Sequence, residues 1–139
     1  MQKIEAKIFV GGVHDDRIER AKTCCNFHSK GEIVWIDGQS RKVLKSPKLY
    51  SGCTEQTKII VIDGLGSVEI LNNFFNIITK GIRVYTSILE SFVIFPELIL
   101  IMDDKIQWQD LPSDGSFLRR FEIVVFEDVD TSILAEIVD

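Results

Sequence analysis

Residues 57–63 have the sequence Thr-Lys-Ile-Ile-Val-Ile-Asp, in which four consecutive β-branched apolar residues precede an aspartate. Apolar and polar residues do not alternate here, as they would in a strand with one face in solvent. We therefore predict a central β-strand that is covered on both faces. Residues 7–10 and 97–102 are also short apolar runs and are predicted as further strands.

A glycine turn and a helix follow the strand at residues 7–10. Gly11-Gly12 allows the chain to turn without the steric cost of a Cβ atom. Asp15 and Asp16 favour the positive end of a helix dipole, and Lys30-Gly31 supplies a stop. The residues predicted on the buried face of this helix are Ile18, Ala21, Cys24, Cys25 and Phe27.

The other segments continue this alternation of strands and helices. We predict strands at 32–37, 42–44 and 121–126, a loop over 46–56, helices over 67–80 and 131–138, and a hairpin of 81–87 with 91–95. Strands separated by helices imply parallel pairing with helices on both faces. The sequence thus predicts one α/β domain over residues 1–139, with three layers and a mostly parallel sheet that the inserted hairpin makes mixed.

The charge of the chain argues against non-specific binding to nucleic acid or to anionic membranes. The formal net charge is −5 and the pI is about 5.1, whereas both partners favour a dense basic face. Local basic character comes from Arg119-Arg120 and from the group Arg41, Lys42, Lys45 and Lys48. Charged residues interrupt the N-terminal segment, and Pro96 and Glu97 interrupt the later apolar run. We therefore expect no signal peptide, no transmembrane helix and a cytoplasmic location.

Three cysteines, Cys24, Cys25 and Cys53, are an odd number, and two of them are adjacent. This pattern favours free thiols in a reducing compartment over a disulfide framework. A zinc site of Cys24, His28, His14 and Cys53 is the alternative, although the chain has no Cys-x-x-Cys pair. A cysteine hydrolase that uses His14 or His28 requires long-range geometry that the sequence does not show. We expect structural thiols and no bound metal.

Two segments in the second half of the chain suggest a family. They are Pro96-Glu97-Leu98-Ile99-Leu100-Ile101 and Ser116-Phe117-Leu118-Arg119-Arg120-Phe121. Together with the glycine turn and the order of the elements, they resemble the core of AAA-type P-loop ATPases. More narrowly, residues 78–127 resemble the ATPase domains of superfamily 3 helicases and of phage or plasmid replication proteins. The resemblance implies a P-loop NTPase-like fold.

The residues of the phosphate-binding loop are largely replaced. A working loop, Gly-x-x-x-x-Gly-Lys-Ser/Thr, holds phosphate with backbone N–H groups and a lysine, and holds magnesium with a hydroxyl. If Gly11 matches the first glycine, then Gly12 follows it and Asp16 takes the place of the second glycine. Arg17 and Ile18 then take the places of the lysine and the hydroxyl. Asp15 and Asp16 add negative charge, so we expect this degenerate Walker A loop to repel a triphosphate.

The other residues that the resemblance implies form an incomplete set. Asp63 stands at the magnesium aspartate of the second motif, but Gly64 replaces the acidic residue that would follow. Asp103 stands where the family usually has a sensor asparagine, and Arg119 or Arg120 stands at its arginine finger. Each has a simpler alternative: Asp63 can serve as a turn residue, and the arginines can pair with Asp103, Asp104 or Glu122.

These observations lead to three functional hypotheses. The first is a non-catalytic interaction module derived from an ATPase, from a phage or mobile element, which binds a protein partner or itself and needs no cofactor. The second is a divergent ATP-dependent enzyme of the replication or helicase type that uses ATP and magnesium through Arg17 and Asp63. The third is a nucleic-acid-binding accessory protein that uses the basic residues, which the acidic net charge disfavours.

Overall fold

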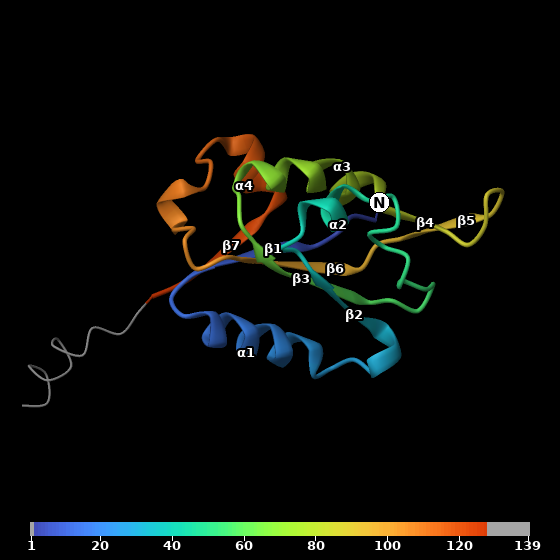
Figure 1. The fold of residues 1–139 in the computed structure, drawn as a ribbon, viewed down its shortest axis with the longest axis horizontal. Coiled ribbons are helices and arrows are strands. Elements are labelled where there is room, and N and C mark those ends of the chain that lie inside the picture. The colour runs from blue at the N-terminus through green and yellow to red at the C-terminus, as the bar shows by residue number, and fades with distance from the viewer. Residues whose placement is uncertain (1, 128–139) are drawn as a thin grey trace, which may run out of the picture.

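The computed structural model describes residues 2–127, so the predicted helix over 131–138 lies outside the described residues. Five parallel strands form the main sheet in the order β2-β3-β6-β1-β7 (Figure 1). Their bounds are β1 Ala6–Gly11, β2 Ile33–Asp37, β3 Ile59–Leu65, β6 Glu97–Met102 and β7 Glu122–Phe126. The predicted α/β class with a mostly parallel sheet is confirmed.

The strands with continuous apolar sequence occupy the middle of the sheet. The residues from Ile59 to Ile62 in β3 are fully buried, and so are those from Leu98 to Met102 in β6. β2 and β7 lie at the two edges, and each mixes exposed and half-buried positions. The predicted strand covered on both faces is therefore confirmed, although it runs from Ile59 to Leu65 instead of over residues 57–63.

Helices cover both faces of the sheet (Figure 1). Helix α1, His14–Cys25, lies alone on one face, where its Ala21 and Cys25 pack against Phe9, Val61 and Ile101. The opposite face carries α2 Arg41–Lys45, α3 Phe75–Lys80 and α4 Gly115–Arg120, together with a 3-10 turn at Glu69–Phe74. Further 3-10 turns occur at Lys30–Glu32 and Trp108–Asp110. None of the helices within residues 2–127 has the length and apolar character needed to cross a bilayer.

Two predicted elements and one residue predicted as buried differ from the structure. The short strand predicted at 42–44 is wrong, because this segment lies in α2, where the Ser40 side chain caps the helix by accepting from the N–H of Val43. The single helix predicted over 67–80 is divided at Phe74 into a 3-10 turn and α3. Phe27 is 88% exposed, because α1 ends at Cys25 and the helical spacing no longer applies beyond it.

The predicted hairpin exists, but it does not belong to the main sheet. Strands β4 Ile82–Tyr85 and β5 Ser91–Ile94 pair only with each other within the described chain and project from the amino end of β6 (Figure 1). Ile82, Val84 and Ile94 anchor the base of the hairpin in the core. The expectation of a mixed main sheet is therefore wrong: all pairings within the five-stranded sheet are parallel.

The phenol of Tyr50 gives a pH prediction. Burial raises its pKa well above the ordinary value of about 10. As the pH rises, the unfolded chain loses this proton before the folded chain does, so the free energy of unfolding should fall above about pH 10. Urea denaturation at a series of alkaline pH values checks this. Tyr50→Phe should reduce that pH dependence, and an unchanged dependence in the variant would contradict the prediction.

Candidate functional site

The glycine turn after β1 lies at the carboxyl edge of the sheet and brings the chain into α1. Gly11 and Gly12 have φ angles of 86° and 62°, in the left-handed region that favours glycine. A Cβ atom on Gly11 would also collide with the carbonyl oxygen of Phe126 in β7. Position 11 therefore requires glycine, both for its positive φ angle and because β7 leaves no room for a side chain. This agrees with the tight turn predicted from the sequence.

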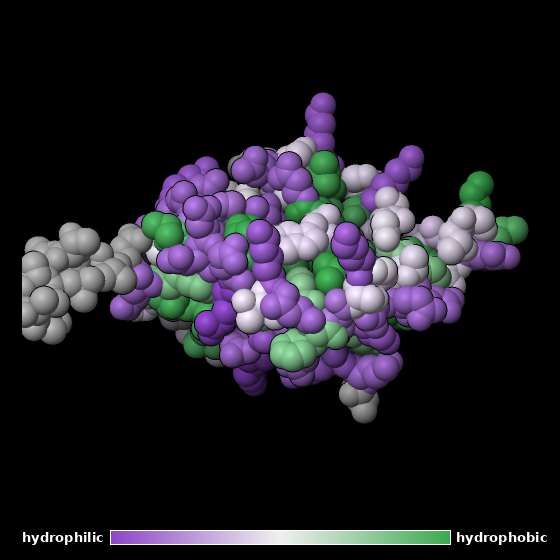
Figure 2. Space-filling view, turned by 90° about the horizontal axis from the view of Figure 1, so that it is seen from below, coloured by the Kyte–Doolittle hydropathy of each residue, from purple (hydrophilic) through white to green (hydrophobic). Residues whose placement is uncertain are grey.

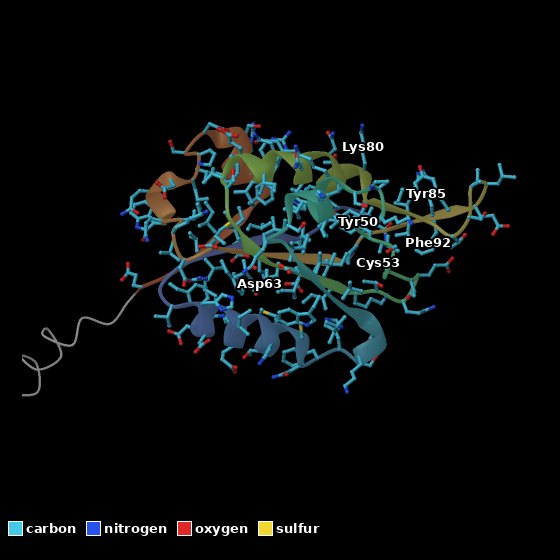
Figure 3. The ribbon with its side chains drawn as sticks, viewed as in Figure 1. Tyr50, Cys53, Asp63, Lys80, Tyr85 and Phe92 are labelled. Atoms are coloured by element: carbon cyan, nitrogen blue, oxygen red, sulfur yellow. The ribbon has the colours of Figure 1, made fainter. Side chains whose placement is uncertain are left out.

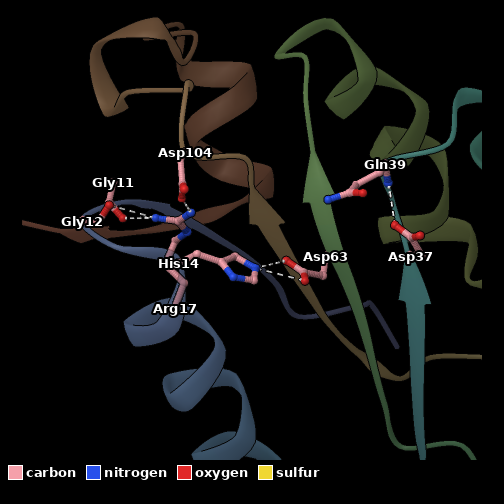
Figure 4. A network of polar contacts seen from close by, with 8 residues as sticks. All are labelled: Gly11, Gly12, His14, Arg17, Asp37, Gln39, Asp63 and Asp104. Atoms are coloured by element: carbon pink, nitrogen blue, oxygen red, sulfur yellow. Dashed lines mark hydrogen bonds and ion pairs between the residues drawn. The ribbon is translucent and has the colours of Figure 1, made fainter.

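Arg17, in the first part of α1, binds the glycine turn with its side chain. Its side chain is fully buried, and its Nη1 atom donates to the carbonyl oxygens of Gly11 and Gly12 at 2.5 and 3.1 Å (Figure 4). Its Nη2 atom donates to Oδ1 of Asp104, which follows β6, and forms an ion pair with it. Arg17 Nε has no hydrogen-bond partner among the described residues. The guanidinium thus joins the turn after β1 to the end of β6.

Asp63 and His14 pair across the same edge. Nε2 of His14 lies 3.0 and 3.1 Å from the two carboxylate oxygens of Asp63, so the first residue of α1 is joined to β3 (Figure 4). The His14 side chain is 44% exposed and the Asp63 side chain is 29% exposed, so solvent reaches the pair. An imidazole held in this way can accept a proton from a water or hydroxyl group.

A hollow of about 190 Å³ opens beside this pair, and its lining residues are His14, Gln39, Gly64, Asp103 and Asp104. Its lining contains no cysteine thiol and no serine hydroxyl, and its ionisable groups are the His14 imidazole and the carboxylates of Asp103 and Asp104. The volume is below the range of about 300–1,000 Å³ that is usual for small-molecule pockets. As it stands, the site can orient an imidazole, but it does not enclose a large ligand.

Two glycines, Gly38 and Gly64, lie beside the hollow where the chain packs closely. Gly64 has a φ of 83°, and a Cβ there would lie 2.6 Å from the Gln39 side chain. The N–H of Gly38 donates to the carbonyl oxygen of Asp63 at 2.6 Å, which ties the loop after β2 to the end of β3. The glycine that replaces an acidic residue in the implied second motif therefore leaves room for Gln39.

Asp103 has a role in the turn after β6. Its N–H donates to the carbonyl oxygen of Leu65 at 2.8 Å, and its Oδ1 accepts from the N–H of Lys105 at 3.1 Å. An aspartate that accepts from the backbone two residues later is a common turn arrangement. Asp103 and Asp63 thus lie near the carboxyl ends of the neighbouring strands β6 and β3, while the sensor role of Asp103 stays a prediction.

Asp15 and Asp16 lie apart from the hollow. Both are exposed in the first turn of α1, where their charges favour the helix dipole, and neither lines the hollow. The predicted position of Asp16 at the second loop glycine therefore corresponds to an ordinary helical residue. The carboxylates that do approach the hollow come from Asp63, Asp103 and Asp104.

The arginine pair lies at the opposite edge of the sheet. Arg119 and Arg120 end α4, immediately before the amino end of β7, whereas Asp63 lies near the carboxyl end of β3. Arg119 donates to the carbonyl oxygen of Gly115 at 3.1 Å, and Arg120 donates to that of Ser116 at 2.9 Å. The Arg120 guanidinium also lies 5.0 Å from the centroid of the Phe75 ring.

These contacts bear on the two roles predicted for the arginine pair. Neither arginine forms an ion pair with another described residue, so the alternative in which they bind Asp103, Asp104 or Glu122 is not observed. A role in reaching a neighbouring subunit stays a prediction. Within one chain they are separated from the site that contains Asp63.

The cysteines do not form a site in this structure. Cys24, Cys25 and Cys53 are free thiols, and no group of three or more His, Cys, Asp or Glu side chains within residues 2–127 is arranged to hold a metal ion. Burial raises the pKa of Cys25 and of Cys53, which lowers the fraction of reactive thiolate at neutral pH. The zinc alternative and the cysteine hydrolase therefore gain no support.

Comparison with known proteins gives no assignment to a family. No protein-family model matches the sequence, and no curated protein matches it.

Proposed function

We propose that this chain is a non-catalytic binding module built on an AAA-type P-loop ATPase core, in which the former nucleotide site has become a structural contact. The observation that carries the proposal is the Arg17 guanidinium, which is fully buried and bound to two carbonyl oxygens of the glycine turn and to Asp104. In a working loop, the cation at this position would point to phosphate instead.

The charge and size of the site also support the proposal. Asp63, Asp103 and Asp104 bring three carboxylates to the hollow and its border, and a triphosphate would be repelled by them. The hollow of about 190 Å³ is small for a nucleotide. The arrangement of the turn after β1, with Asp63 and Asp103 at the neighbouring strand ends, agrees with descent from an ATPase core.

Isothermal titration with ATP and magnesium tests the first part of the proposal. We expect no binding heat at concentrations where an ordinary ATPase is saturated, and no phosphate release in a sensitive turnover assay. The reason is that Arg17, the buried cation at the turn, already has three acceptors within the chain. Micromolar binding, or measurable turnover, contradicts the proposal.

Three alanine variants distinguish a non-catalytic module from a divergent ATP-dependent enzyme. If turnover occurs and disappears in both Asp63→Ala and Arg119→Ala but persists in Arg20→Ala, the chain is instead a divergent ATP-dependent enzyme. Arg20 is an exposed residue of the same helix as Arg17 and therefore controls for loss of a positive charge.

A further inference from the structure

The tip of the β4–β5 hairpin presents two adjacent apolar side chains to solvent. Ile88 is 97% exposed and Leu89 is 95% exposed. The hairpin projects from the body of the molecule, and its end is strongly hydrophobic in the space-filling view (Figure 2). Scattered exposed apolar residues are ordinary, but two together at the end of a projecting hairpin indicate a contact surface.

Hydrogen bonds fix the shape of this tip. The N–H of Thr86 donates to the carbonyl oxygen of Glu90 at 3.0 Å, and the Ser87 hydroxyl accepts from the N–H groups of Leu89 and Glu90 at 3.3 and 3.1 Å. The tip is thus held by its own polar contacts while Ile88 and Leu89 point outward. A preformed surface loses less conformational entropy when it binds.

An apolar hollow lies beside the same hairpin. Its volume is about 470 Å³, and it lies between the hairpin and the loop after α2, with Pro47, Lys48, Tyr50, Arg83, Tyr85 and Ile88 among its lining residues. Tyr50 lines it from the loop after α2 and Tyr85 lines it from the hairpin; both are labelled in Figure 3. Ile88 borders this hollow, whereas Leu89 does not line it and remains almost fully exposed.

The charges of the tip and the hollow are complementary. Glu90 is exposed next to Leu89, while Lys48 and Arg83 stand at the hollow. Arg83 donates to the Ser91 hydroxyl at 2.8 Å, and neither Lys48 nor Arg83 forms an ion pair with another described residue. An incoming tip that carries a carboxylate would therefore meet two cations.

We propose that two copies of this chain associate about a two-fold axis by exchanging hairpin tips, with Leu89 of each copy in the hollow of the other and Glu90 beside Lys48 and Arg83. Because the protruding group and its hollow belong to the same chain, a two-fold arrangement satisfies both at once. The inference rests on the proposed function as a binding module and names a second copy as the partner.

Sedimentation equilibrium over a concentration series tests this self-association. We expect the wild type to form dimers and Leu89→Ser to raise the dimer dissociation constant by about 100-fold or more, because each dimer loses two buried leucine side chains. Leu118→Ser is the matched control, since Leu118 is a 49% exposed leucine on α4, away from the hairpin. Circular dichroism verifies that both variants are folded.

A charge exchange tests the pairing of Glu90 with the hollow. Glu90→Lys alone and the double variant Lys48→Glu with Arg83→Glu alone should both be monomeric, because each places like charges at the contact. When the two proteins are mixed, both contacts are again complementary, and heterodimers should form. A mixture that remains monomeric overturns the predicted pairing.

Three outcomes overturn the self-association itself: a wild type that is monomeric at every concentration, a dimer that Leu89→Ser does not weaken, or a dimer that Leu118→Ser weakens equally. Binding of the wild-type monomer to anionic phospholipid vesicles, lost in Leu89→Ser, would assign the tip to a lipid surface instead. These results are independent of the ATP titration, so failure of the dimer and failure of the non-catalytic proposal are distinguishable.

Discussion

Replacing Arg17 by methionine is expected to lower the free energy of unfolding by about 3–5 kcal/mol. Methionine keeps much of the length of the side chain but leaves the carbonyl oxygens of Gly11 and Gly12 without their donor. An acceptor left unpaired in a buried position costs roughly 1–3 kcal/mol. The ion pair with Asp104 adds less, because the Asp104 side chain is 68% exposed and can be hydrated when Arg17 is removed.

Urea denaturation of the wild type and of four variants, Arg17→Met among them, separates these contributions to the free energy of unfolding. Arg20→Ala removes an exposed arginine from the same helix and should change stability by no more than about 0.5 kcal/mol. Asp104→Ala leaves the buried guanidinium without this counter-charge and should cost roughly 1–3 kcal/mol, less than Arg17→Met. Arg17→Lys keeps the charge but cannot reproduce the planar fork of the guanidinium, so its stability should lie between those of the wild type and Arg17→Met.

The result for Arg17→Met also bears on function. If Arg17 served mainly to bind nucleotide, its removal would leave the stability of the ligand-free protein nearly unchanged and would affect only binding. A wild-type level of stability in Arg17→Met would therefore contradict the structural role and weaken the proposal of a non-catalytic module. A large loss of stability supports it, because the cation is then needed to hold the turn itself.

The fold was largely predictable because its central strands are unusually uniform. The continuous, short apolar runs of β3 and β6, which contain β-branched residues, favour strands covered on both faces, and the two glycines after β1 favour a tight turn. The helical segments were harder to predict where sequence signals were short. Residues 42–44 contain too few residues to show a period, so capping by Ser40 decided the outcome. The separation of the hairpin from the main sheet depends on long-range packing.

The candidate site was predictable only in part. The chain order brings Gly11, Asp63 and Asp103 to one edge, since parallel strands all end on the same side. The pairing of His14 with Asp63 was missed, although a histidine at the start of the helix after the turn was a signal that it could reach that edge. The contact between Arg17 and Asp104 was missed because it joins residues 87 positions apart, and a helical arginine is normally expected in solvent.

Replacing Gly11 by alanine is expected to destabilise the fold by about 3–5 kcal/mol. The φ angle of 86° costs an L-residue roughly 1–3 kcal/mol, and the added methyl group meets the carbonyl oxygen of Phe126. This neighbour is backbone in an adjacent strand, so it cannot move aside as a flexible side chain could. Relief would require β1 and β7 to separate at the point where Gly11 pairs with Phe126.

Gly31→Ala is the matched control for this prediction, measured by thermal and urea denaturation. A Cβ on Gly31 meets no atom within 4 Å, and its φ is not positive, so the substitution should change stability by no more than about 1 kcal/mol in either direction. Equal stabilities of Gly11→Ala and Gly31→Ala would contradict the close approach of the turn to β7. A large difference between them would mean that the backbone of β7 holds the turn on one side, while the Arg17→Met measurement tests whether the guanidinium holds it on the other. A turn fixed in this way has little freedom to rearrange around a phosphate group, which is why the two stability measurements bear on the same proposal as the ATP titration.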